Sequence, residues 1–240
     1  MQLFAQPIAQ TAPAATAGLD IIYADDALLV LNKPSGLLAV PGRGEDKQDC
    51  LSARVQQQFP DALVVHRLDM ATSGLMLMAR GVAAQRALSR AFAVREVHKR
   101  YMAVVDGHLA PPAGTLDGWG VIDLPIVVDW PKRPLRIIDK ERGKPSLTRW
   151  RVFPNDPRWG APTSDEDAAT TRLELEPVTG RSHQLRVHLQ ALGHPILGDA
   201  LYASPAAQAR AKRLLLHAWA LRIRHPQTGH VLAFDSPPPF

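Results

Sequence analysis

One polar stretch, residues 65–74, reads Val65-His66-Arg67-Leu68-Asp69-Met70-Ala71-Thr72-Ser73-Gly74 and lies between two apolar runs. The flanking residues 63–65 and 75–79 are long or β-branched aliphatics, which predicts two buried strands with a break at Ser73-Gly74. Side chains alternate along an extended segment, so Arg67 and Asp69 should face one side while His66 and Leu68 face the other. The pattern therefore predicts a carboxylate beside a guanidinium.

A carboxylate next to an arginine stays ionised, because the positive charge lowers the pKa of the acid. An ionised carboxylate can act as a nucleophile or as a general base, so Asp69 is the candidate for chemistry. The alternative is that Arg67 and Asp69 form only a structural pair at a strand end. A protein kinase is a poor match, since a leucine precedes Asp69 and neither a glycine-rich phosphate loop nor Asp-Phe-Gly accompanies it.

Length and composition indicate a folded globular chain of 240 residues with 46% hydrophobic residues. Cys50 is the only cysteine, which excludes an internal disulfide and a four-cysteine zinc site and indicates a reducing compartment. No apolar run reaches the ~18 residues of a membrane span. The first 20 residues contain no Lys or Arg, unlike a secretory signal. We therefore expect a soluble, cytoplasmic protein that does not enter a membrane.

The order of elements predicts an α+β fold with a mixed, largely antiparallel central sheet and flanking helices. Residues 1–19 lack periodicity and are expected to form a disordered arm, so that residues 20–240 form the domain. Alternating or apolar patterns predict strands at 21–23, 28–31, 101–105, 147–153, 171–175, 219–223 and 231–234. Residues 109–145 should be irregular, and residues 154–169 should protrude as an acidic insertion.

Helices are predicted where apolar residues recur at helical spacing. Asp49 is the expected cap of a helix that ends at Pro60, and residues 82–93 should bury Ala84 and Leu88. A third helix should begin at the cap Ser182 and end at Gly193, and a fourth should cover residues 206–215. Arg181 would then lie at a helix N-terminus, which favours anions, and Asp69 is the obvious carboxylate for it to hold.

Positive charge is concentrated in the last third of the chain. Residues 177–230 carry seven Lys and Arg residues and one acid. Their local charge of +6 exceeds the net charge of +5 of the whole chain. A polyanion such as a nucleic acid is the natural partner, although a solvated basic face is equally common. The segment Trp130-Pro131-Lys132-Arg133-Pro134 places two basic side chains beside an indole, which also suits a nucleic acid. Lys132 and Arg133 are therefore candidate RNA contacts, and packing is the alternative role for Trp130.

Other catalytic classes find less support. None of the nine histidines has a convincing metal-ligand spacing, so we expect no metal, and no G-x-S-x-G serine hydrolase motif occurs. A glycosidase would need a second carboxylate in a comparable polar patch, and none stands out. Tyr101, in a predicted strand, is either a core residue or a functional one.

Three separated motifs resemble the RluA family of pseudouridine synthases. They are residues 66–74, the turn Asn32-Lys33-Pro34-Ser35-Gly36, and residues 180–188 followed by Gly193-His194-Pro195-Ile196. The similarity runs from about Asp20 to the end of the chain, His66 is typical of this family, and no S4-like RNA-binding domain precedes it. The segments 130–134 and 143–145 look most like short members that modify both 23S ribosomal RNA and the anticodon stem-loop of transfer RNAs.

The resemblance implies a role for each candidate residue. Asp69 is the catalytic aspartate, Tyr101 stacks on the target uracil and can help to move a proton, and Arg181 pairs with Asp69. Arg67 fills the space left by the flipped nucleotide, with His66 in the same RNA-binding motif, and Leu185 lines the base pocket.

The expected protein is thus an RNA uridine isomerase that needs no cofactor, because substrate and product contain the same atoms. The expected partner is structured RNA, both 23S ribosomal RNA and the transfer RNA anticodon stem-loop, and the expected oligomeric state is a monomer. The alternatives are a non-catalytic RNA-binding protein, a nucleosidase, or a family member with a single RNA substrate.

Overall fold

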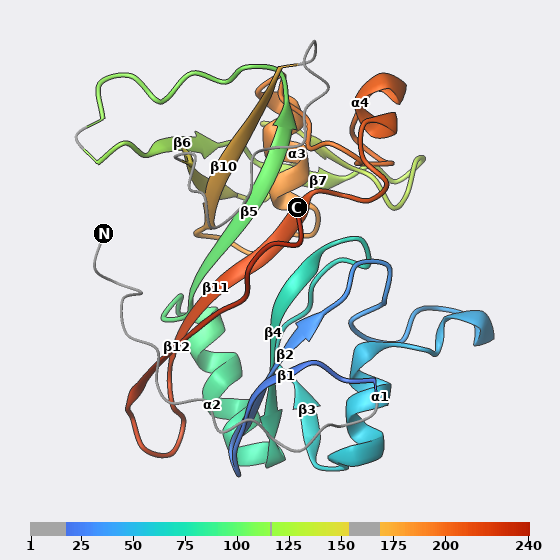
Figure 1. The fold of residues 1–240 in the computed structure, drawn as a ribbon, viewed down its shortest axis with the longest axis vertical. Coiled ribbons are helices and arrows are strands. Elements are labelled where there is room, and N and C mark those ends of the chain that lie inside the picture. The colour runs from blue at the N-terminus through green and yellow to red at the C-terminus, as the bar shows by residue number, and fades with distance from the viewer. Residues whose placement is uncertain (1–17, 116, 154–168) are drawn as a thin grey trace. The chain divides into compact units, whose positions relative to one another are not determined.

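The computed structural model describes residues 18–115, 117–153 and 169–240 in two compact units (Figure 1). The first unit takes the described residues up to Lys99 together with Ala218–Pro237. The second unit takes the described residues of Arg100–His217 with Pro238–Phe240. Most of the predicted 1–19 arm and all but the last residue of the predicted 154–169 insertion lie outside the described residues.

Antiparallel strands form the first unit. β1 (Ile21–Ala24), β2 (Leu28–Lys33) and β4 (Ser73–Arg80) lie side by side, and the short β3 (Ala62–Val64) also pairs with β4. β11 (Leu216–Arg224), most of which belongs to this unit, follows β4 in the strand order and pairs with β12 (Val231–Asp235). β4 begins at Ser73, so the predicted break at Ser73-Gly74 is wrong: Gly74 pairs with Lys33 inside the ladder.

Two α-helices and one short 3-10 helix accompany these strands: η1 (Glu45–Lys47), α1 (Leu51–Gln58) and α2 (Gly81–Ala93). α2 buries Ala84 and Leu88, as its spacing predicted. The predicted cap of α1 is wrong by one residue, because the Cys50 sulfur accepts the Ala53 N–H while the Asp49 carboxylate binds the Arg54 guanidinium.

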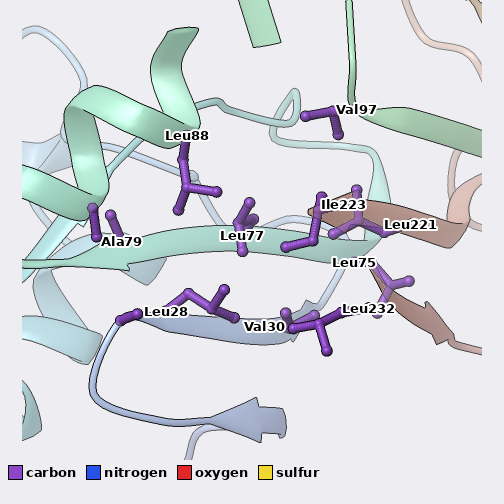
Figure 2. Close-up of a cluster of buried hydrophobic side chains, with 12 residues drawn as sticks. Leu28, Val30, Leu75, Leu77, Ala79, Leu88, Val97, Leu221, Ile223 and Leu232 are labelled. Atoms are coloured by element: carbon purple, nitrogen blue, oxygen red, sulfur yellow. The ribbon is translucent and has the colours of Figure 1, made fainter. Parts of the chain in front are cut away.

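A buried apolar cluster joins the sheet to α2 in this unit (Figure 2). β4 contributes Leu75, Leu77 and Ala79, which point to one face as strand alternation requires. Leu88 of α2 and Ile223 of β11 pack against the same cluster. The cluster fixes β4, and with it the end of the 65–72 loop that precedes β4.

The second unit contains a four-stranded antiparallel sheet in the order β5-β10-β9-β6. Its strands are β5 (His98–Asp106), β6 (Gly120–Asp123), β9 (Leu147–Val152) and β10 (Thr170–Pro177), with the first two residues of β5 in the first unit. β7 (Ile126–Val128) and β8 (Arg136–Ile138) form a separate hairpin. The helices are α3 (Gln184–Ala191) and α4 (Pro205–Ala209).

The predicted α+β class with largely antiparallel pairing is confirmed, and two local predictions in the second unit are wrong. Residues 109–145 are not irregular throughout, because β6, β7 and β8 lie within them. These strands have three or four residues each, too few to produce a clear alternating pattern. The helix predicted over 206–215 ends at Ala209. None of the helices in the described ranges is long and apolar enough to cross a membrane.

Gly74 provides a test of the β4–β11 packing. It has a φ of 109°, and a Cβ at this position would stand 2.3 Å from the Ala218 carbonyl oxygen. Gly81 also has a positive φ, 76°, but nothing lies within 4 Å of a Cβ built there. We expect Gly81→Ala to cost about 1 kcal/mol of strain and Gly74→Ala several times more, because only Gly74→Ala forces backbone apart. Urea unfolding of both variants measures this difference, and equal losses would contradict it.

Candidate active site

Asp69 lies in the irregular segment that joins β3 to β4. Leu68 before it is buried, Met70 after it is 52% exposed, and Asp69 itself is half-buried. The Asp69 carbonyl accepts the Thr72 N–H at 3.1 Å, which closes a turn directly after the carboxylate. The carboxylate is thus attached to a folded loop, and its neighbour Leu68 fixes the loop to the core.

Arg67 is exposed and, within the described ranges, makes no hydrogen bond or ion pair. The predicted pairing of Arg67 with Asp69 is therefore wrong. The physical reason is that the chain leaves the β conformation after Val64, so the two side chains do not share a strand face. The guanidinium remains available for a partner outside the protein.

His66 anchors the loop from the inside. Its Nε2 accepts the Leu77 N–H at 2.9 Å, and its ring stacks on Phe92 with centroids 4.5 Å apart. An accepting Nε2 leaves the proton of the neutral ring on Nδ1. Burial, assisted by the positive charge of Lys99, lowers the pKa of His66 to about 3. These contacts give His66 a structural role, and its direct contact with RNA stays a prediction that they do not support.

Lys33 holds the other side of the same loop. It is fully buried at the end of β2, and its Nζ donates to the carbonyls of Pro34 at 2.8 Å, Leu37 at 2.7 Å and Met70 at 3.1 Å. The Ser35 hydroxyl donates to the Ala71 carbonyl at 2.7 Å, and the Gly36 N–H donates to that of Met70. We define the lysine clamp as Lys33, Ser35 and Gly36 holding the backbone of residues 70–71.

Sequence reasoning treated residues 32–36 only as a turn and a family motif, and so missed Lys33 as a residue that shapes the site. The available signal was a lysine that directly follows the apolar run 28–31 and Asn32 and precedes Pro34-Ser35-Gly36. A buried ammonium is stable only where several acceptors surround it, and Lys33 meets that need with backbone carbonyls from two segments.

In the second unit, Arg181 belongs to the turn before α3 and is exposed, with its Nε 3.3 Å from the Pro145 carbonyl. The predicted cap Ser182 is wrong: the N-cap is His183, in the left-handed conformation with a φ of 58°, and its side chain makes no capping bond. Instead the buried Gln184 side chain accepts the Arg181 N–H at 3.0 Å and the Thr179 hydroxyl at 2.7 Å. Gln184 therefore sets the position of the Arg181 backbone.

Buried polar contacts tie α3 to its surroundings. The Gln184 amide donates to the Thr148 hydroxyl, which donates in turn to Nδ1 of the fully buried His188, whose Nε2–H reaches the Leu124 carbonyl at 2.9 Å. Burial lowers the pKa of His188, which agrees with this neutral form. Arg186 forms a buried bidentate pair with Asp199 at 2.8 and 2.6 Å. Sequence reasoning missed these residues because their partners are far away in the chain.

The other predicted site residues take distinct positions in the second unit. Tyr101 is half-buried on β5 opposite Leu175 of β10, and Leu185 is buried on α3. Lys132 and Arg133 are exposed in the connection between β7 and β8. The start of β8, directly after that connection, is joined to the start of α3 through Tyr202. The Tyr202 hydroxyl accepts the Arg136 N–H at 2.9 Å and forms a hydrogen bond of 2.7 Å with His183 Nδ1.

Comparison with known proteins identifies the class to which this chain belongs. The family model described as RNA pseudouridylate synthase matches residues 27–191, a span that holds Asp69, Tyr101 and Arg181. The chain therefore belongs to the RNA pseudouridylate synthases, and it is an isomerase. This confirms the family predicted from the motifs.

Three similar proteins show which members of this family the chain resembles. The dual-specificity RNA pseudouridine synthase RluA of Escherichia coli (strain K12) is 50% identical over 224 residues, 92% of this chain and 94% of the relative. The protein of the same name from Yersinia pestis is 49% identical over 214 residues, 89% of this chain and 96% of the relative. Human RNA pseudouridylate synthase domain containing 1 is similar in structure, with a TM-score of 0.71, 30% identity, and coverage of 96% of this chain and 87% of that one.

The pKa of His66 predicts how acid affects folding. Because this pKa is about 3 in the folded chain and about 6.5 in an ordinary histidine, the unfolded chain takes up the proton first and stability falls as the pH drops below about 6.5. His66→Gln keeps an acceptor for the Leu77 N–H and cannot titrate. Between about pH 7 and pH 5, wild type should therefore lose ~2 kcal/mol more than His66→Gln in urea unfolding. The exposed His98→Gln should keep the wild-type slope, and equal slopes for all three proteins would contradict the assignment.

The lysine clamp predicts a stability loss without a cavity. Lys33→Met keeps most of the side-chain volume but removes the buried ammonium that donates to three backbone carbonyls. We expect the free energy of unfolding to fall by about 1–3 kcal/mol or more. Lys47→Met, at an exposed position, should change it by less than about 0.5 kcal/mol. Equal unfolding midpoints for the two variants would show that the lysine clamp does not contribute to the free energy of unfolding.

Proposed function

We propose that this isomerase converts specific uridines to pseudouridine in both 23S ribosomal RNA and the anticodon stem-loop of transfer RNAs, with Asp69 as the catalytic residue. Two observations support the choice of substrates: the 50% identity to a dual-specificity enzyme over 92% of the chain, and an exposed basic connection between β7 and β8. The observation that carries the catalytic role is the position of Asp69 in a loop fixed from both sides by His66 and the lysine clamp.

The reaction breaks the bond between N1 of uracil and C1′ of ribose, turns the base and forms a bond from C5 to C1′. C5 loses its proton and N1 gains one, so that substrate and product contain the same atoms. An ionised Asp69 can add to the base, attack the sugar carbon or abstract a sugar proton, and each route needs the carboxylate without its proton. We infer that Arg181 pairs with Asp69 and maintains that ionised state. Tyr101 would stack on the extruded uracil, and Leu185 would line the pocket that receives it.

Extrusion of the uridine costs a few kcal/mol of stacking and pairing energy, which contacts to RNA must offset. Arg67 suits the place vacated by the base, because its guanidinium is exposed and has no ion pair among the described residues. A planar guanidinium can stack between neighbouring bases and bind phosphate at the same time. Lys132 and Arg133 would add phosphate contacts, which carry no sequence information but strengthen binding.

The decisive change is Asp69→Asn, which keeps the size of the side chain and removes its charge. We expect pseudouridine formation to fall by at least about 10³-fold while RNA affinity stays within about tenfold, because the substitution leaves the basic contacts intact. Carbodiimide labelling followed by primer extension detects pseudouridine, whereas mass measurement misses an isomer. Asp46→Asn, at an exposed position on η1, is the matched control and should modify RNA at the wild-type rate.

The same measurement separates the alternatives. Turnover retained by Asp69→Asn would refute the catalytic assignment, and release of free uracil would indicate a nucleosidase. In a strain that lacks the gene, both 23S ribosomal RNA and transfer RNA should contain unmodified uridine at the positions that are pseudouridine in the wild type. Loss of pseudouridine from only one of them would establish a single-substrate enzyme.

A further inference from the structure

Trp130, in the connection between β7 and β8, is an aromatic residue on the surface of the second unit. Its side chain is 64% exposed, whereas Trp119 and Trp150 are each 8% exposed. Among the described residues, no other Phe, Tyr or Trp falls in the exposed class. A large aromatic surface left in water forgoes the stabilisation that burial would give, so its position calls for a physical reason.

The connection is ordered by its own hydrogen bonds. The Asp129 N–H donates to the Leu135 carbonyl at 3.1 Å, and the Leu135 N–H donates to that of Lys132 at 3.0 Å. The Lys132 N–H donates in turn to the Asp129 carbonyl at 3.2 Å. These backbone hydrogen bonds place Trp130 in an ordered turn.

The base of the hairpin is fixed equally well. Leu135 and Ile138 pack against a buried cluster of Ile126, Val187 and Tyr202, and Val187 belongs to α3. The Tyr202 hydroxyl joins the Arg136 backbone of β8 to the His183 ring at the start of α3. Trp130 is therefore held in a set position relative to the turn that carries Arg181, within the same unit.

Positive charge surrounds the indole. The Arg133 guanidinium lies over the Trp130 ring at 4.6 Å from its centroid. Within the described part of the chain, neither the Arg133 nor the Lys132 side chain forms an ion pair with a carboxylate, although the Lys132 backbone N–H lies 3.4 Å from the Asp129 carboxylate. Residues 129–144 contain six Lys and Arg residues and three acids, and one of these acids, Asp139, is bound by Arg142. The patch thus offers an aromatic ring within a cationic surface.

We propose that Trp130, backed by Arg133, is a stacking platform for one unpaired nucleobase of the RNA substrate, outside the pocket for the target uridine. Every nucleobase has a π face that can stack on an indole, and the neighbouring cations match the phosphates on either side. A protein partner is a poorer match, because the centre of a protein interface is depleted of charge and built from several apolar residues. The inference rests on the proposed function for its ligand, an RNA.

A thermodynamic cycle tests the contact directly. RNA affinity is measured for wild type, Trp130→Ala and Trp130→Phe with one synthetic anticodon stem-loop and with versions in which each loop nucleotide in turn lacks its base. Stacking on one base predicts that Trp130→Ala binds the intact RNA roughly 5- to 150-fold more weakly, while Trp130→Phe retains most of the affinity. At a single loop position, removal of the base should weaken the wild type by a similar factor and leave Trp130→Ala unchanged.

Two controls keep the outcomes distinct. Lys140→Ala removes one exposed charge from the same segment and should weaken all the RNAs uniformly, with no dependence on the position of the missing base. Because Trp130 is exposed, Trp130→Ala should keep the wild-type urea midpoint, which separates binding from folding. Equal affinity of Trp130→Ala and wild type, or losses that add at every loop position, would overturn the platform.

The platform and the proposed function fail separately. A protein that shows the base-specific coupling but forms no pseudouridine would refute the proposed substrates and keep the platform. If the protein forms pseudouridine but Trp130→Ala binds RNA as tightly as wild type, the platform is refuted and the proposed function is kept.

Discussion

The buried ammonium of Lys33 is the contact on which the shape of the Asp69 loop depends. A primary ammonium has three donors, and here they satisfy carbonyls of Pro34, Leu37 and Met70. An unpaired buried charge would be very costly, so the lysine holds the 34–37 turn and the 69–72 turn in a single arrangement. The role proposed for Asp69 needs a carboxylate placed within a fraction of an ångström of its target, and a loop held by its own backbone suits that requirement.

Two neutral histidines also hold separate parts of the chain together. His66 accepts the Leu77 N–H, while His188 accepts from the Thr148 hydroxyl and donates to the Leu124 carbonyl. Each ring has the tautomer that its partners require, and burial lowers the pKa of both. These histidines act as fixed connectors between elements of the chain.

The residues proposed to contact RNA contrast with these internal contacts. Arg67, Lys132 and Arg133 are exposed, and among the described residues their side chains form no ion pair with a carboxylate. Their supports are rigid: Leu68 anchors the segment of Arg67, and the Leu135 and Ile138 side chains anchor the hairpin of Arg133. Binding RNA with side chains on ordered segments limits the conformational entropy lost on association.

The sequence by itself determined the family, the candidate Asp69, strands with clear alternation and the buried face of α2. The strands predicted at 219–223 and 147–153 lie at 216–224 and 147–152 in the structure. These features are local, because a period of two or of 3.6 residues and a continuous motif can be recognised without knowing what packs against them. The same local reasoning failed at the short strands β6 to β8 and at the caps Asp49 and Ser182, where neighbouring residues compete for the same backbone groups.

Only the tertiary structure decided that Arg67 does not pair with Asp69, that His66 turns inward, and that Lys33 is buried against Met70, 37 residues away. It also decided that Trp130 stays on the surface while two other tryptophans are buried. The physical reason is that a side chain's role depends on donors, acceptors and apolar surface brought together by distant parts of the chain. No local pattern of residues records which of those parts will meet.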